Sequence, residues 1–158
     1  MRTCKNICAL LLLVLAAVGL LLSGCGKDES GIAYGNAVFT RGEVHFLQDH
    51  ETRTSIFKTY ADASAVLTEA DISEDVSSVY DEAYFEKNQL LMVAFFGNSV
   101  CDYSVNDLTL KDGTLTVCIN EKQPRESTLL GVAEVLLIDI PAGALPEDVR
   151  VDVQIIEK

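Results

Sequence analysis

The chain has few of the residues from which catalytic, metal and nucleic-acid sites are built: it holds two histidines, no tryptophan, and 12 basic against 24 acidic residues. Binding to phosphates requires clustered lysine and arginine, so this balance excludes nucleic acid as a partner. Neither the G-x-S-x-G motif of a nucleophilic serine nor the G-x-x-x-x-G-K phosphate loop occurs. His45 and His50 have no third ligand nearby and do not indicate a zinc site. We therefore expect no metal and no cofactor.

The acidic residues do not follow a metal-binding pattern. Asp71, Glu74 and Asp75 lack the regular alternation of a calcium loop, so they indicate a solvated loop. The formal charge of −12 favours solubility and self-repulsion. The alternative interpretation is attraction to a basic partner or to divalent cations.

The first 24 residues are typical of a secretory signal. A short segment containing Arg2 and Lys5 precedes the uncharged run Ile7–Leu22, and this order is that of a cleaved signal peptide. Sixteen helical residues would span about 24 Å, which is short of the roughly 30 Å of a bilayer core. A transmembrane helix is therefore the weaker interpretation.

The run ends in a tetrapeptide that resembles the bacterial lipobox, with Leu22, Ser23 and Gly24 before Cys25. In that motif the cysteine thiol takes a diacylglyceryl group, and the new amino group is acylated as well. Two or more acyl chains, such as palmitate, hold a protein stably on a membrane. The alternatives are an ordinary signal with an incidental cysteine, or an uncleaved anchor. We predict a lipoprotein anchored through Cys25 on the extracytoplasmic face of the cell membrane.

Cleavage before Cys25 would leave 134 residues with 10 basic and 24 acidic side chains, a formal charge of −14. That length fits one domain. Residues 25–36 include the polar, glycine-containing stretch Gly26–Asn36, which predicts a flexible tether. The expected organisation is a signal peptide over 1–24, a tether over 25–36 and a single β-rich domain over 37–158.

The first half of the domain predicts two strands and a helix. Ala37–Gln48 and Thr52–Lys58 favour strands and are separated by a polar turn, so they predict a hairpin. Over Thr59–Ala70, apolar residues recur at helical spacing and Thr59 is a suitable N-cap. Asp71–Ser78 is expected to be a loop, and Asp81–Phe85 one helical turn.

The second half predicts five strands. Gln89–Phe96 is apolar on both alternating faces, which indicates the centre of a sheet. Val149–Ile156 alternates and indicates a half-exposed strand. The remaining strands are Val100–Leu110, Thr114–Glu121 and Gly131–Ile140. The predicted fold is mainly β (α+β), an antiparallel sandwich or curled sheet with one amphipathic helix.

The dipeptide Asp112-Gly113 predicts a tight hairpin, which also bears on the cysteines. With this loop Cys118 lies opposite Asp107, about 20 Å along the strand from Cys101. A disulfide needs Cα atoms within about 7 Å. We therefore expect these two cysteines to remain thiols, although a bulge in the strand would weaken the argument.

Two residues are candidate centres should the chain be an enzyme. Asp139 lies inside an apolar strand, where burial would raise its pKa and suit it to acid–base catalysis. The simpler interpretation places Asp139 on an open face or near the strand end before Pro141. Cys101 would need a histidine beside it to act as a nucleophile.

Residues 81–158 resemble the C-terminal domain family named for the protease complex subunit PrcB. The resemblance rests on the aromatic and acidic approach to a buried strand at Tyr84-Phe85-Glu86, then on Asp112-Gly113, and on a final pair of apolar strands. The glycine-rich turn that often follows the family's central strand is reduced here to Gly97 and Tyr103. The resemblance implies a surface lipoprotein without catalysis, which stabilises or organises a partner such as a secreted protease.

Three hypotheses for the function follow. The leading one is a non-catalytic module that binds or stabilises a protein partner in the envelope or outside the cell, favoured by the tether and the acidic composition. The alternative is a surface receptor for a small ligand or a cation. The third is an enzyme centred on Asp139 or Cys101.

Overall fold

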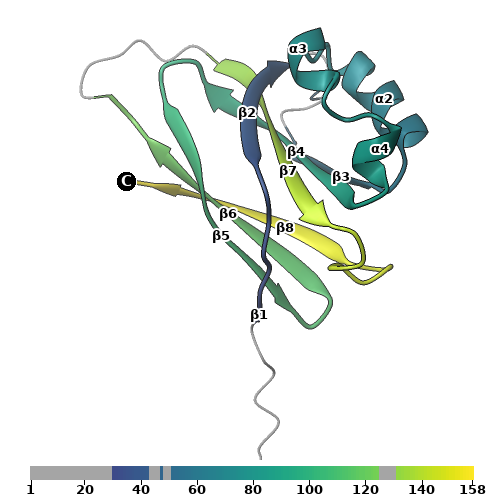
Figure 1. The fold of residues 1–158 in the computed structure, drawn as a ribbon. Coiled ribbons are helices and arrows are strands. Elements are labelled where there is room, and N and C mark those ends of the chain that lie inside the picture. Colours follow the sequence, from purple (N-terminus) through teal and green to yellow (C-terminus); the bar gives the residue numbers. More distant parts are fainter. Residues whose placement is uncertain (1–29, 43–46, 48–50, 125–130) are drawn as a thin grey trace, which may run out of the picture.

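The computed structural model describes residues 30–42, 47, 51–124 and 131–158. Two four-stranded sheets pack face to face, and helices lie along the outer side of one of them (Figure 1). This sandwich confirms the predicted mainly β fold class. The strands are β1 (Ser30–Gly31), β2 (Ala37–Gly42), β3 (Arg53–Phe57), β4 (Asn88–Asn98), β5 (Asp102–Lys111), β6 (Thr114–Lys122), β7 (Gly131–Pro141) and β8 (Arg150–Glu157). The helices are α2 (Tyr60–Glu69), α3 (Glu74–Ser77) and α4 (Glu82–Phe85).

The helix-covered sheet has the strand order β2-β7-β4-β3 and is antiparallel throughout. Its central strand β4 is buried on both faces, as its continuous apolar run predicts. Alternate residues such as Leu91 and Val93 face the second sheet, while Leu90 and Met92 face the helices. The protein therefore has two apolar layers, one on each side of β4 and β7.

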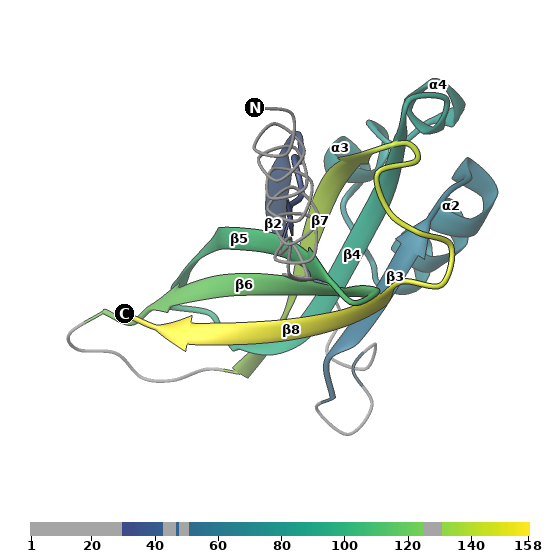
Figure 2. The same ribbon diagram turned by 90° about the horizontal axis from the view of Figure 1, so that it is seen from below.

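The second sheet, the open sheet, has the order β1-β5-β6-β8 (Figure 2). Asp112 and Gly113 both have positive φ, 52° and 76°, as the expected two-residue turn requires. The predicted register is confirmed, with Thr109 opposite Thr116 and Asp107 opposite Cys118. β8 is parallel to β6, which departs from the antiparallel pairing expected of the sandwich.

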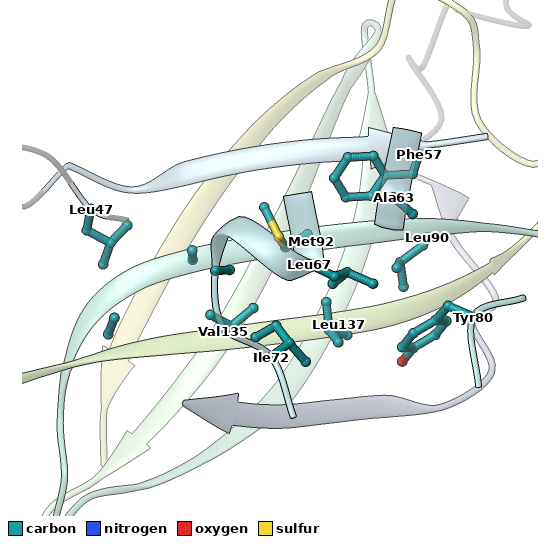
Figure 3. Packing of buried hydrophobic residues seen from close by; sticks show 13 residues of the cluster. Leu47, Phe57, Ala63, Leu67, Ile72, Tyr80, Leu90, Met92, Val135 and Leu137 are labelled. Carbon is teal, nitrogen blue, oxygen red and sulfur yellow. The ribbon is translucent and has the colours of Figure 1, made fainter. Parts of the chain in front are cut away.

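The helices bury their apolar faces against the helix-covered sheet. The hydroxyl of Thr59 accepts a hydrogen bond of 3.3 Å from the backbone N–H of Asp62, which confirms the predicted cap of α2. Ala63 and Leu67 point from α2 into the layer that Leu90 and Met92 form below them (Figure 3). The turn α4 is also confirmed, whereas α3 occupies a segment predicted to be a loop.

The predicted hairpin between the first two strands of the domain is wrong. β2 pairs with β7 and β3 pairs with β4, so the two strands lie at opposite edges of the helix-covered sheet. Strand propensity and a polar turn are local signals, so they cannot show which strands pair. Both segments pair with the most apolar strands of the chain instead of with each other. Residues 43–46 and 48–50, which contain His45 and His50, lie outside the described residues.

The predicted tether is too long, because its second half belongs to the domain. Ser30 and Gly31 pair with β5. The N–H of Ile32 donates to the carbonyl oxygen of Leu108 at 2.9 Å. Ile32 also packs against the core between the sheets. The polar residues around it in the sequence gave no signal of this contact. The chain then crosses to the helix-covered sheet, and only residues 25–29 are left of the expected tether.

Candidate functional site

A pocket of about 400 Å³ lies where β4, β5, β6, β7 and β8 meet at one end of the sandwich. We call it the strand-end pocket. Its walls carry aromatic and aliphatic side chains together with two carboxylates. They include Phe95, Phe96, Tyr103, Glu121, Ile155 and Glu157.

Tyr103 is held firmly in the wall of this pocket. Its ring contacts the ring of Phe95 edge-on, with centroids 5.2 Å apart, and stacks on Phe39 at 6.1 Å. Its hydroxyl accepts a hydrogen bond from the N–H of Asn98 at 2.8 Å and donates one to Glu121 Oε1 at 3.5 Å. Burial raises the pKa of Tyr103 to about 12, so the hydroxyl stays protonated at neutral pH.

Gly97 leaves the space that Tyr103 occupies. A Cβ atom on Gly97 would lie 2.6 Å from Glu134 Cγ and 2.9 Å from Tyr103 Oη, closer than real Cβ contacts come. Gly97 and Tyr103 lie six residues apart in the sequence, and the structure brings them into contact. A glycine is therefore required here by packing, not by a positive φ.

Glu134 is the most buried acid described, with a side chain only 7% exposed. It lies opposite Phe95 in the β4–β7 ladder, on the face turned toward the open sheet. Its ion-pair partner, Arg41, is 63% exposed and approaches Oε1 to 3.7 Å. Burial raises the pKa of Glu134 above its ordinary value, and Arg41 offsets only part of this effect.

This raised pKa makes ionised Glu134 a cost to folding. An acid with a raised folded pKa stabilises the fold below its unfolded pKa, near 4.5, and loses that contribution as pH rises through the folded pKa. We expect Glu134→Gln to raise the free energy of unfolding at pH 7 by on the order of 1 kcal/mol. Urea unfolding at pH 4 and pH 7 should show a gain only at pH 7. Exposed Glu86→Gln is the control, and a Glu134→Gln variant less stable at pH 7 would contradict the prediction.

Both cysteines of the domain are free thiols, as the hairpin register predicts. Cys118 lies on the outer face of the open sheet, opposite Asp107 and Gln154. Burial and the carboxylate of Glu121 raise the pKa of the Cys101 thiol. A raised pKa keeps the thiol protonated, and this does not suit a nucleophile.

Asp139 is half-buried two residues before Pro141, near the strand end as the simpler interpretation expects. Its carboxylate accepts hydrogen bonds from Tyr84 Oη at 2.9 Å and from the N–H of Asn36 at 3.4 Å. Burial, followed by the charge of Asp139, raises the pKa of Tyr80 to about 12. Asp139 thus ties α4 and the segment before β2 to β7, which is a structural arrangement.

Several predicted site residues lie outside the described part of the chain. These are Cys25 with the lipobox residues Leu22, Ser23 and Gly24, and both histidines. Within the described residues, no group of three or more His, Cys, Asp and Glu side chains is arranged to hold a metal ion. No helix of this part is long and apolar enough to span a bilayer.

Sequence reasoning missed Glu134 and its partner Arg41. A signal was present, because Glu134 interrupts the apolar strand GVAEVLLIDI just as Asp139 does. The sequence pattern shows two acids in one strand, but how far each side chain is buried depends on which elements cover the strand. The pocket itself joins residues from five strands and has no local signature.

A second depression, of about 380 Å³, lies between α2 and α3. Its lining is mainly hydroxyl and acidic side chains such as Ser64, Thr68 and Glu74. The strand-end pocket differs because exposed apolar side chains surround it. No protein-family model, curated protein or solved structure matches this chain.

Proposed function

We propose that this protein is a lipid-anchored, extracytoplasmic module that binds a protein partner at the strand-end pocket and has no catalytic activity of its own. Its anchor is the acyl group on Cys25. The partner is an envelope or secreted protein, and the resemblance described above makes a secreted protease one class to test. The observation that carries this proposal is the gathering of exposed apolar side chains at the pocket.

Large apolar side chains are exposed around the pocket. Phe96 is 42% exposed and Ile155 is 40% exposed, and both line the pocket. Single exposed apolar residues are common, but a cluster around a concave site is typical of a protein-binding surface. Aromatic anchors of this kind usually contribute most of the binding energy.

The rim of the pocket is acidic and therefore favours a basic partner. Glu121 and Glu157 both line the pocket and face each other across the β6–β8 ladder. The whole chain carries a formal charge of −12, which adds a long-range attraction for cationic groups. We infer that the partner presents an apolar side chain flanked by lysine or arginine.

The proposed anchor and the pocket belong to opposite ends of the open sheet. Ser30 pairs with Leu110, near the Asp112-Gly113 turn, whereas Tyr103 and Glu121 lie at the other end of the same two strands. Five residues from Cys25 to Ser30 span at most about 18 Å. A bilayer at the anchor therefore leaves the pocket accessible to a partner.

Site-specific photo-crosslinking in cells tests this function. A benzoylphenylalanine at position 96 should give one adduct with an envelope or secreted protein, and the same probe at Thr116, on the outer face of the open sheet, should not. Glu157→Lys should reduce the adduct at least tenfold by reversing a rim charge. Cys25→Ser should move the chain out of the membrane fraction. Equal labelling at both positions, or an adduct unaffected by Glu157→Lys, would exclude binding at this pocket.

The alternative function, a receptor for a small ligand or a cation, is favoured by one observation. The pocket volume of about 400 Å³ is within the range of small-molecule sites. Thermal unfolding with a panel of divalent cations and envelope fragments separates the two proposals. An upward shift that Glu121→Gln abolishes would favour the receptor.

A further inference from the structure

β8 is an edge strand of the open sheet and is well suited to pair with another strand. Of the four edge strands it is the longest, with eight residues against six in β2, five in β3 and two in β1. Figure 2 shows β8 along the margin of the open sheet, and among the described strands it pairs only with β6. Such an edge presents a row of backbone donors and acceptors.

The hydrogen bonds to β6 show which residues of β8 point outward. The N–H of Arg150 donates to the carbonyl oxygen of Gly113 at 2.9 Å, and the N–H of Lys158 donates to that of Glu121 at 2.9 Å. Because direction alternates along a strand, Val151, Val153 and Ile155 direct their N–H and C=O groups away from β6. The β6–β8 register has no shift, and β8 contains no proline or glycine. The edge therefore lacks the bulge or proline that often blocks strand addition.

The composition of β8 favours a second copy of the same strand. Over residues 150–158, which are β8 and the residue after it, Arg150 and Lys158 balance Asp152 and Glu157, so this segment is neutral in a chain with a formal charge of −12. Two copies can approach here without local repulsion. Val151 and Val153 pack against the core between the sheets, while Ile155 on the same face remains 40% exposed.

We propose that two copies of the chain pair antiparallel through β8, with Val153 of each copy on the two-fold axis. The outward-pointing residues must then lie opposite one another, so Val153 meets Val153 and Val151 meets Ile155 of the other copy. The exposed Ile155 gains an apolar partner. On the other face Asp152 lies opposite Gln154, which can donate a hydrogen bond to it.

The neighbouring registers are less favourable. A shift of the pairing in one direction places Asp152 opposite Asp152 of the other copy, and like charges directly opposite are destabilising. A shift in the other direction places Val151 opposite Glu157, which brings a carboxylate onto the apolar face. The register centred on Val153 avoids both contacts, and Glu157 then lies opposite Val149, which precedes β8. The two open sheets then form one continuous sheet with isologous symmetry.

Sedimentation equilibrium of the full chain in density-matched detergent micelles tests this dimer. The unchanged protein and Val79→Lys, a control at a 62% exposed valine away from β8, should both have the mass of two chains. Ile155→Lys should weaken the dimer at least tenfold. Val153→Pro should do the same, because it removes an N–H that points away from β6 and leaves the β6–β8 ladder intact.

Circular dichroism must show that both β8 variants stay folded. If Ile155→Lys unfolds the protein, Val153→Pro alone still tests the dimer. A single-chain mass for the unchanged protein at every loading concentration would overturn the proposal. A mass of two chains for folded Ile155→Lys and Val153→Pro would overturn it as well. Ile155 also lines the strand-end pocket, so Ile155→Lys affects both proposals. Val153→Pro separates them, because Val153 does not line the pocket and position 96 stays available for the crosslinking experiment.

Discussion

Phe95→Ala is expected to lower the free energy of unfolding by about 3–5 kcal/mol, the largest effect of any single substitution proposed. Phe95 is 1% exposed and lies in β4, the central strand between the two apolar layers. Its ring contacts Tyr103 at 5.2 Å and is surrounded by apolar side chains from both sheets. Truncation removes buried apolar surface and leaves a cavity. The hydrogen-bonded strands of the helix-covered sheet cannot move enough to close it.

The adjacent residue provides a matched control. Phe96 points to the other face of the same strand and is 42% exposed, so Phe96→Ala should cost less than about 1 kcal/mol. Urea unfolding of both variants measures the difference. Since a domain of this size is stable by about 5–15 kcal/mol, Phe95→Ala should move the midpoint far below that of Phe96→Ala. Equal midpoints would show that the two rings are equally buried, in conflict with the structure.

The parts of the fold that the sequence predicts are those encoded by neighbouring residues. The run Gln89–Phe96 marks the central strand because no polar residue interrupts either face. Asp112-Gly113 predicts both the turn and the register, since few other dipeptides adopt two consecutive positive φ values. Thr59 and the apolar spacing after it predict α2 for similar reasons.

The errors concern partners that lie far apart in the chain. β2 and β3 are correctly predicted to be strands, but each pairs with a strand more than thirty residues away instead of with its neighbour. Ser30–Gly31 has no strand signal of its own and is ordered by its contact with β5. Likewise the parallel pairing of β8 with β6 depends on how the chain returns after β7, which no local pattern records.

The candidate site was only partly accessible to sequence reasoning. Gly97 and Tyr103 contact each other in the structure, although no local sequence pattern places them together. Asp139 is a predicted candidate because it is a charged residue in an apolar strand, yet Glu134 in the same strand is the more buried of the two. Burial depends on which elements cover a strand. Glu134 and Asp139 therefore differ in exposure although both interrupt the same apolar strand.

Gly97→Ala is the second substitution for which we expect a large effect, a loss of about 1–3 kcal/mol in the free energy of unfolding. The added methyl group would lie 2.6 Å from Glu134 Cγ and 2.9 Å from Tyr103 Oη. Neither neighbour moves easily, because Tyr103 is held by the N–H of Asn98 and Glu134 is enclosed between the sheets. Gly31→Ala is the control, since no atom lies within 4 Å of a Cβ at Gly31.

A double-mutant cycle identifies the cause of this loss. Glu134→Ala removes the Cγ atom that the new methyl group would meet, so the combined variant should lose less stability than the two single variants together suggest. We expect a coupling free energy of about 1 kcal/mol, measured by urea unfolding. Strict additivity would show that the Tyr103 contact alone limits the size of residue 97. In that case Tyr103, rather than Glu134, would explain why the turn beside the pocket requires glycine.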